Sequence, residues 1–224
     1  MLSATQKKER IENKLRIARE GLPFIAISLG LTLIFGLLVW IVFFILFALI
    51  SIFVIGFFRD PQRQQEVPVD AVLAPADGRI IRIEHLPDNQ NPLGRPARKI
   101  SIFMSVFNVH VNRNVVNGRV MRIQYLPGKF LSANLDKASA GNERNQLTLE
   151  TQSGQRIVVV QIAGLIARRI ACWVNEGEEV VAGQRFGLIR FGSRLDVYLA
   201  EECRIPVQKA QRTRAGQTII AYMP

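Results

Sequence analysis

The sequence is poor in the residues that most often build metal sites and disulfide frameworks. Its 224 residues include only two cysteines and two histidines. Cys172 and Cys203 stand far apart and in no zinc-binding spacing, so a structural zinc site is not indicated. We expect both to be small buried residues in a reducing compartment, and a single disulfide between them is the alternative.

Acidic residues are also scarce, with 18 Asp and Glu against 29 Lys and Arg and a formal net charge of +11. Such a charge attracts nucleic acids, but no aromatic-rich RNA motif, zinc spacing or helix-turn-helix pattern accompanies it. The same charge attracts anionic lipid, at about 1 kcal/mol per basic residue near the surface. We therefore predict an anionic membrane surface, and no nucleic acid, as a partner.

Charged residues are absent altogether from Leu22 to Phe58, an apolar run of 37 residues. The apolar part of a cleaved signal peptide is only about 7 to 15 residues, so the run is better explained as a membrane anchor. As one helix it would be about 56 Å long, nearly twice the hydrocarbon thickness. We predict a helical hairpin that turns between Gly36 and Trp40; one long tilted helix is the alternative.

Basic residues flank this run on both sides. Residues 1–20 hold six Lys or Arg against three Glu, and Arg59 and Arg63 follow the run. The positive-inside rule then places both flanks in the cytoplasm. We predict a basic cytoplasmic segment over 1–21, a membrane hairpin over 22–58, and a catalytic domain over 59–224 on the cytoplasmic side of the cell membrane.

The remainder of the chain, from Glu66 onward, has the short alternating runs of a β-rich domain. Strands are expected over 72–83 with a turn at Asp77 and Gly78, and over 99–113, 118–126, 146–151, 156–162, 166–173, 187–191 and 195–199. The segment 175–187 resembles a turn of a barrel-sandwich hybrid, the fold of lipoyl carriers. We predict a β-dominated (α+β) single domain of that kind after the hairpin. Within 99–113, alternation would place Asn108, His110 and Asn112 on one strand face.

Gly192 and Ser193 lie between the last two predicted strands, at a bend. Gly192 has no Cβ, so its carbonyl is sterically open, and the hydroxyl of Ser193 lies beside it. A Gly-Ser bond of this kind can rearrange to an ester and then eliminate. From these residues alone, an ordinary tight turn is the simpler interpretation.

Six blocks, in order along nearly the whole chain, resemble the short bacterial and archaeal-type branch of the phosphatidylserine decarboxylase proenzymes. The blocks are 57–61 (FFRDP), 74–78 (APADG), 107–113 (FNVHVNR), 142–145 (NERN), 161–170 (QIAG and ARRI) and 191–194 (FGSR). Other branches of the family have Leu and Thr where Phe191 and Arg194 flank the Gly-Ser pair. This departure matches the short branch, and it weakens the transfer of substrate contacts from the others.

The resemblance implies a self-processing enzyme with a covalent pyruvoyl group and no metal. Ser193 would be the nucleophile of self-cleavage and the source of the pyruvoyl group, His110 its base and later the acid, and Asp77 the residue that orients His110. Cleavage between Gly192 and Ser193 would give a large chain, 1–192, and a small chain, 193–224, held as a heterodimer that could dimerise further. An α-keto amide is an electron sink comparable to a pyridoxal ring.

Two classes of function follow from these observations. The first is a membrane-bound enzyme that converts phosphatidylserine to phosphatidylethanolamine and CO₂, or acts on a related serine phospholipid such as an archaeal ether lipid. The second is a non-enzymatic membrane-anchored adaptor of the lipoyl-carrier fold. A carrier needs a lysine at the hairpin tip, and no lysine occurs between Asn175 and Arg190.

Overall fold

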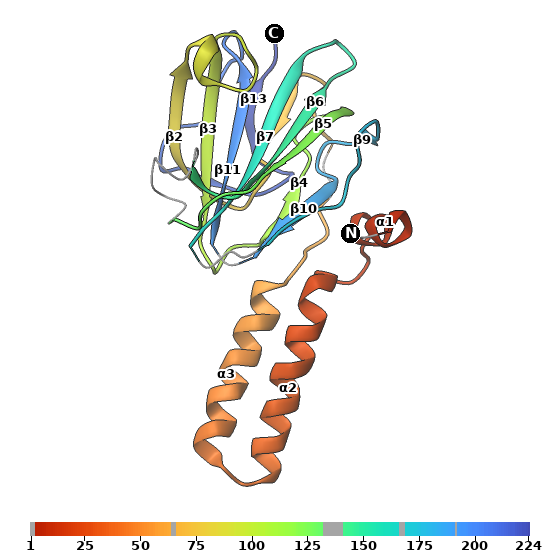
Figure 1. Ribbon diagram of the computed structural model, residues 1–224, viewed down its shortest axis with the longest axis vertical. Coiled ribbons are helices and arrows are strands. Elements are labelled where there is room, and N and C mark those ends of the chain that lie inside the picture. The colour runs from red at the N-terminus through yellow and green to blue at the C-terminus, as the bar shows by residue number, and fades with distance from the viewer. Residues whose placement is uncertain (1–2, 64–65, 132–140, 166–168, 191) are drawn as a thin grey trace.

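The computed structural model describes residues 3–63, 66–131, 141–165, 169–190 and 192–224 (Figure 1). Helices precede a β-rich domain. Helix α1 (Ala4–Ile11) is followed by a short 3-10 turn (Arg19–Gly21) and by helices α2 (Leu22–Leu37) and α3 (Ile41–Phe57). Figure 1 shows α2 and α3 as an antiparallel pair that projects away from the strands. The chain therefore has two parts, an apolar helical hairpin and a β domain.

The hairpin turns where the sequence predicts, between Leu37 and Ile41. Val39 adopts a positive φ of 57° at this turn. Large apolar side chains of both helices face outward, while Ser28 and Ser51 are buried between them. The hydroxyls of Thr32 and Ser51 lie 3.2 Å apart across the pair. In a medium without water, polar contacts of this kind between helices contribute to their association.

Only the first of these helices passes as a membrane span by both length and composition. The apolar helical stretch Arg19–Leu37 is 19 residues long, whereas Ile41–Phe57 has 17. Each is close to the length of about 20 residues that a helix needs to cross the hydrocarbon core.

The β domain is built from antiparallel strands in three sheets. Its strands are β1 (Ala71–Leu73), β2 (Gly78–Leu86), β3 (Ala97–Met104), β4 (Val111–Arg113), β5 (Gly118–Leu126), β6 (Arg144–Glu150), β7 (Arg156–Ala163), β8 (Ile170–Cys172), β9 (Glu179–Val180), β10 (Arg185–Ile189), β11 (Ser193–Ala200), β12 (Arg212–Thr213) and β13 (Ile219–Tyr222). The eight-stranded sheet has the order β12-β2-β3-β11-β7-β6-β5-β9 and curls into a half-barrel (Figure 1). Strands β4-β10-β8 and β1-β13 form the two smaller sheets.

The prediction of a β-rich domain after N-terminal helices is confirmed, but the continuous strand over 99–113 is wrong. Strand β3 ends at Met104 and β4 begins at Val111. Between them, Asn108 Oδ1 accepts hydrogen bonds from the backbone N–H and the hydroxyl of Ser105, both at 2.9 Å. Side chain to backbone bonds of this kind compete with strand pairing and favour a turn. Asn108 and His110 therefore lie on a loop.

The strands on either side of the Asp77–Gly78 turn are also separated in space. Strand β1 pairs with β13, whereas β2 pairs with β3 and β12. Both cysteines are free; Cys203 is buried and Cys172 is partly buried. The disulfide considered as an alternative is therefore not formed.

Two clusters of buried side chains matter for the site. The main core fills the half-barrel, and a smaller one lies where the helices meet the strands. The smaller cluster contains Phe57 and Phe58 from the end of the hairpin and Val109, Val111, Trp173 and Leu188 from the β domain. The hairpin is thus packed onto the β domain through an apolar junction.

Candidate active site

The three site residues predicted from the sequence all lie where a strand begins. Asp77 directly precedes β2, His110 directly precedes β4, and Ser193 is the first residue of β11. Strands β2 and β11 belong to the eight-stranded sheet and β4 to the three-stranded one. The charge of Asp77 reaches His110, but His110 Nε2 forms no hydrogen bond with Ser193.

Ser193 is buried in the middle of the large sheet. It pairs with Met104 of β3 on one side and with Ala163 of β7 on the other. Its side chain is fully shielded from solvent, and Ser193 Oγ lies 3.4 Å from Met104 Sδ. A thioether is a weak hydrogen-bond acceptor, so this contact leaves the hydroxyl easily displaced.

Gly192 supplies the space that attack on its own carbonyl needs. Its φ of 66° is in the left-handed region, and a Cβ at this position would meet no atom within 4 Å apart from its chain neighbours. Glycine adopts this conformation at little cost, whereas a larger residue would be strained there. The bend predicted at the Gly-Ser pair is therefore present.

His110 is buried between the hairpin and the β domain. Its ring packs against Phe57 in a tilted arrangement with 4.1 Å between centroids, and Nδ1 lies 2.9 Å from the carbonyl oxygen of Asn108. Since a carbonyl can only accept, Nδ1 carries the proton and donates it to Asn108. The other nitrogen, Nε2, is buried and has no hydrogen-bond partner among the described residues, and its lone pair is available.

Burial lowers the pKa of His110 from its ordinary value near 6.5 to about 4. The hydrogen bond to Asn108 and the negative charge of Asp77 oppose this shift, while the positive charge of Arg59 adds to it. His110 is therefore neutral at physiological pH, which is the form in which an imidazole acts as a base.

Asp77 does not contact His110 directly. Its carboxylate forms a two-pronged ion pair with Arg63, at 2.5 and 2.8 Å, and accepts a hydrogen bond from the backbone N–H of Ala215 at 2.8 Å. Asp77 reaches His110 only through its charge, which raises the histidine pKa. The orientation of the imidazole ring comes instead from Phe57 and Asn108.

A chain of buried amides, not expected from the sequence, leads to Ser193. Asn145 Nδ2 donates to Gln161 Oε1 at 2.9 Å, and Gln161 Nε2 donates to Asn112 Oδ1 at 2.8 Å. Asn112 Nδ2 then lies 3.8 Å from Met104 Sδ, the atom that Ser193 also contacts. A signal was present in the sequence, because Gln161 is a polar residue within the apolar run of β7.

Gly187 makes room for this amide chain. A Cβ at Gly187 would come within 2.9 Å of Gln161 Nε2 and within 2.3 Å of the backbone oxygen of Ala171. Any larger residue would therefore displace β8 or the amide of Gln161. This explains why a strand interior contains glycine at this position.

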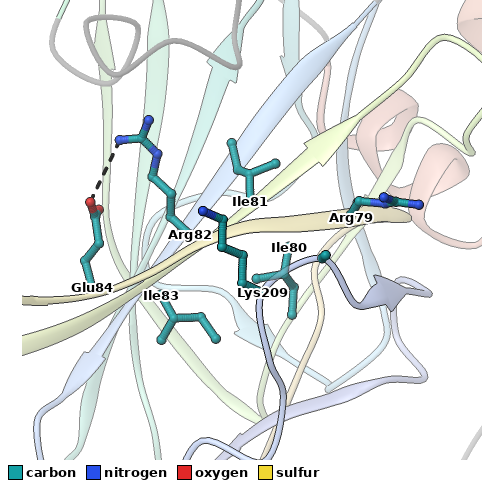
Figure 2. A pocket seen from close by; sticks show the side chains of 8 residues that line it. Arg79, Ile80, Ile81, Arg82, Ile83, Glu84 and Lys209 are labelled. Atoms are coloured by element: carbon teal, nitrogen blue, oxygen red, sulfur yellow. Dashed lines mark ion pairs between the residues drawn. The ribbon is translucent and has the colours of Figure 1, made fainter.

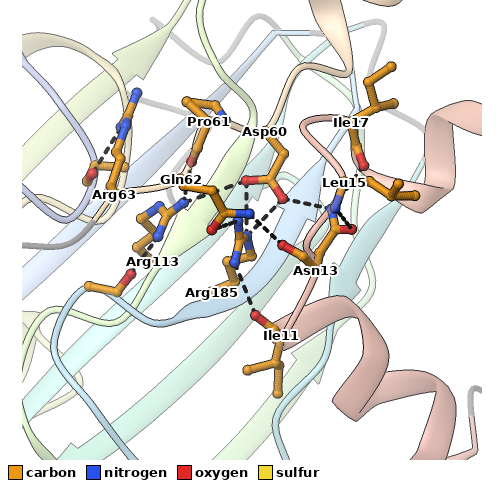
Figure 3. Close-up of polar contacts among 12 residues, drawn as sticks. Ile11, Asn13, Leu15, Ile17, Asp60, Pro61, Gln62, Arg63, Arg113 and Arg185 are labelled. Atoms are coloured by element: carbon orange, nitrogen blue, oxygen red, sulfur yellow. Dashed lines mark hydrogen bonds and ion pairs between the residues drawn. The ribbon is translucent and has the colours of Figure 1, made fainter.

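Asp60 is a second feature that was not expected from the sequence. It is buried just after the hairpin, and Arg185 Nε donates to both of its carboxylate oxygens, at 3.0 and 2.7 Å (Figure 3). Asn13 Nδ2 donates to it at 2.9 Å, and Arg113 lies 3.5 Å away. Burial and the neighbouring Arg185 lower the pKa of Arg113 to about 10. Asp60 thus joins the N-terminal segment, the hairpin exit and strands β4 and β10.

Metal ligation is not supported by the described part of the chain. Within it, no three His, Cys, Asp or Glu side chains are grouped as a metal ion would require.

Comparison with known proteins assigns the chain to one family, and the match includes Asp77, His110 and Ser193. A family model described as phosphatidylserine decarboxylase matches residues 50–221. The phosphatidylserine decarboxylase proenzyme of Geotalea uraniireducens (strain Rf4) is 49% identical over 208 residues, which are 93% of this chain and 97% of that protein. Proteins of the same name from Magnetococcus marinus and Burkholderia ambifaria (strain MC40-6) are 48% and 50% identical. They cover 90% and 92% of this chain, and 93% and 96% of their own lengths.

Proposed function

This chain belongs to the phosphatidylserine decarboxylase family and decarboxylates phosphatidylserine, and from that premise we propose how its own residues prepare and perform the reaction. Membership decides against the non-enzymatic adaptor. Enzymes of this family are made as proenzymes and carry a pyruvoyl group derived from a serine of their own chain. We assign that serine to Ser193, and the observation that carries the assignment is a buried serine directly after a glycine whose carbonyl is sterically open.

The surroundings of Ser193 fit a pyruvoyl group. The serine β-carbon becomes a methyl group in the pyruvoyl form, and the neighbouring Met104 Sδ is an apolar, polarizable contact suited to it. Nε2 of His110 is buried and forms no hydrogen bond with any described residue, so it can take part in the reaction. When formed, the group supplies an electron sink for the departing CO₂. The protein residues bind the substrate, exclude water and transfer protons around it.

Self-cleavage begins with the hydroxyl of Ser193. Its Oγ attacks the carbonyl carbon of Gly192, the C–N bond breaks, and the proton from Oγ ends on the released amine. The α-proton of Ser193 then leaves to a base, the Cβ–Oγ bond breaks, and Gly192 departs as a carboxylate. Water replaces the resulting enamine nitrogen with oxygen and releases ammonia. The products are chain 1–192 and chain 193–224.

His110 is the base in this sequence. A serine hydroxyl is a weak nucleophile near neutral pH and needs a neighbouring base. Nε2 of His110 is neutral, buried and without a partner, so it can accept a proton. In the decarboxylation that follows, the same nitrogen can return a proton to the carbon that has lost CO₂.

Asp77 acts on His110 by its charge, and Arg63 holds the Asp77 carboxylate in place. Its negative charge stabilises the imidazolium that forms when His110 accepts a proton, because it raises the pKa of that group. Its ion pair with Arg63 fixes the carboxylate at the start of β2. We therefore assign Asp77 an electrostatic role in place of the direct orienting contact.

The two chains remain together after cleavage. The small chain would contain β11, β12 and β13, and each of these strands pairs with strands of the large chain. Strand β11 lies between β3 and β7 in the interior of the large sheet. These strand pairs can hold the large and small chains together as a heterodimer without a covalent link.

The hairpin anchors this enzyme in the membrane of its substrate. Its outward-facing apolar side chains suit lipid, and basic residues border both ends. We propose that both helices cross the cell membrane and that the β domain faces the cytoplasm. We also propose that the β domain is a scaffold of the barrel-sandwich type that holds the site.

Replacement of Ser193 by alanine tests the assignment. Ser193→Ala should leave a single folded chain on a denaturing gel and release no CO₂ from phosphatidylserine. Ser101→Ala is the matched control, since Ser101 is a fully buried serine of β3 whose hydroxyl has no hydrogen-bond partner. That variant should cleave and turn over like the unsubstituted chain. Cleavage or turnover by Ser193→Ala would exclude Ser193 as the source of the pyruvoyl group.

A further inference from the structure

A cavity of about 1110 Å³ lies where the helices meet the β domain. One side is formed by Lys7, Arg10, Arg19 and the start of α2, at Pro23 and Phe24. The other side comes from β5, β6, β8 and Arg190. Because α2 belongs to the apolar hairpin, the cavity lies at the level where lipid head groups would meet the protein. Its size is sufficient for a small polar molecule or a head group.

The cavity contains more positive charge than its own acids neutralise. Arg10 is paired with Glu20, Arg19 with Glu9, and Lys7 Nζ donates to Asn175 Oδ1 at 2.6 Å. Arg169 and Arg190, in contrast, form no ion pair with any residue that the structure describes. Three of the five cations, Lys7, Arg169 and Arg190, therefore lack a partner of opposite charge among the residues that the structure describes, and of these only Lys7 is held by a neutral amide.

These two arginines lie next to each other. The backbone N–H of Arg190 donates to the carbonyl of Arg169 at 3.4 Å, and the Arg190 guanidinium lies 5.5 Å from the ring centroid of Phe24. Burial and the charge of Arg169 lower the pKa of Arg190. Two adjacent guanidinium groups repel each other, and a bound anion would remove that repulsion.

The cavity is connected to the cleavage site. Asn145 lines the cavity and begins the amide chain that continues through Gln161 and Asn112 to Met104, beside Ser193. Arg190 is three residues before Ser193 in the sequence. An anion bound by the arginines would therefore lie close to the reacting end of the site.

We propose that Arg169 and Arg190 bind the phosphodiester of the substrate head group, with Phe24 directing its acyl chains toward the hairpin. This inference rests on the proposed function, which places the reaction at Ser193. Guanidinium groups bind phosphate oxygens in a forked geometry. The carboxylate of the serine head group is a less suitable ligand, because an ion pair with it would stabilise the ground state that must lose CO₂. Free phosphate has the same chemistry, so the experiment must separate the two sources.

Steady-state kinetics of the full-length chain in detergent micelles test the proposal. Arg169→Gln and Arg190→Gln should each raise KM for phosphatidylserine about tenfold, the loss expected for one charge-assisted contact. Arg169→Lys and Arg190→Lys should recover only part of that loss. A denaturing gel should show complete self-cleavage in the variants, so a failure of Ser193 processing is seen separately from a failure of head-group binding.

Matched controls come from a second basic cavity that shares no lining residue with the first. Arg79 and Lys209 line it, beside β2 (Figure 2). Arg79→Gln and Lys209→Gln remove the same charge and should leave KM unchanged. An equal rise of KM in all four Gln variants would show a general attraction to anionic micelles and would overturn the proposed site.

Competition distinguishes a head group from free phosphate. Glycerophosphoserine, which is the head group without acyl chains, should inhibit the unsubstituted enzyme competitively and should inhibit Arg169→Gln and Arg190→Gln about tenfold more weakly. Inorganic phosphate at the same concentration should inhibit much less. Equal inhibition by inorganic phosphate, lost in the same two variants, would assign the arginines to free phosphate and contradict head-group recognition.

Discussion

At the scale of single residues, the site depends on an imidazole that is kept neutral. His110 is enclosed by Phe57 and by the loop that carries it, and burial is the largest cause of its low pKa. Desolvation disfavours the charged form of histidine, so the base remains unprotonated well below neutral pH. In the proposed self-cleavage, a protonated His110 could not accept the proton of the Ser193 hydroxyl.

The rate of self-cleavage should therefore be nearly independent of pH from 8 down to about 5 and fall below a midpoint near 4. The neutral form of His110 is the active form, so the rate increases as pH rises through its pKa. Chains made by cell-free synthesis and followed on gels over time would give the profile. A midpoint near 6.5, the ordinary value for histidine, would contradict the buried base.

Two variants move this midpoint in opposite directions. Asp77→Asn should lower it, because the charge of Asp77 raises the pKa of His110, and Arg59→Gln should raise it, because the charge of Arg59 lowers that pKa. A purely structural role for Asp77 would reduce the rate at every pH and leave the midpoint in place.

At the scale of elements, the loop between β3 and β4 rests on the end of α3. Phe107 contacts Phe53 edge to face at 6.3 Å, the ring of His110 packs at a tilt against Phe57, and Arg59 donates to the carbonyl of Phe107 at 2.7 Å. Helix α3 thus helps to position the loop that carries His110. Sequence alternation did not reveal this loop, because Val109, His110 and Val111 continue the pattern of a strand.

Asp60 holds these elements together, so Asp60→Asn should destabilise the fold by about 3 to 5 kcal/mol, the range for breaking a buried ion pair. The cause is that Arg185 and Arg113 would remain buried beside an uncharged amide. Chemical unfolding of the full-length chain in detergent would measure the loss. Asp88→Asn, at an exposed position, is the control and should change stability little. Equal stability of the two variants would show that the Asp60 cluster contributes nothing measurable.

The elements themselves were largely predictable, whereas their contacts were not. Alternating apolar residues located β5, β7 and β11, and the charge-free run located the hairpin. Alternation does not specify which strands pair, so the separation of β1 from β2 was not foreseen. The pairing of Asp77 with Arg63 was likewise hidden, because a side-chain partner depends on how distant turns meet in space.

At the scale of the whole molecule, the hairpin and the β domain have opposite requirements for solvent. The hairpin exposes its apolar side chains, and the β domain encloses its own. With basic segments on both sides of the apolar run, a hairpin returns the chain to the side on which it began. On the proposed topology, the enzyme would reach a substrate head group from the cytoplasmic surface.

Cysteine labelling tests this topology. Val39→Cys, at the exposed hairpin turn, should react with a membrane-impermeant maleimide added outside intact cells. Glu66→Cys, after the hairpin, should react only once the cells are permeabilised. The unsubstituted chain controls for Cys172 and Cys203. Labelling of Glu66→Cys from outside would show that the run crosses once and that the β domain faces outward.

The intact masses of the purified chains test the central claim most directly. Cleavage between Gly192 and Ser193 predicts a chain ending at Gly192 and a chain of 32 residues, 193–224, that begins with a pyruvoyl group. That small chain should be lighter by one ammonia than the same peptide beginning with serine, and it should resist amino-terminal sequencing. A single uncleaved mass in the active enzyme, or a small chain that begins with an unmodified amino acid, would contradict the assignment of Ser193.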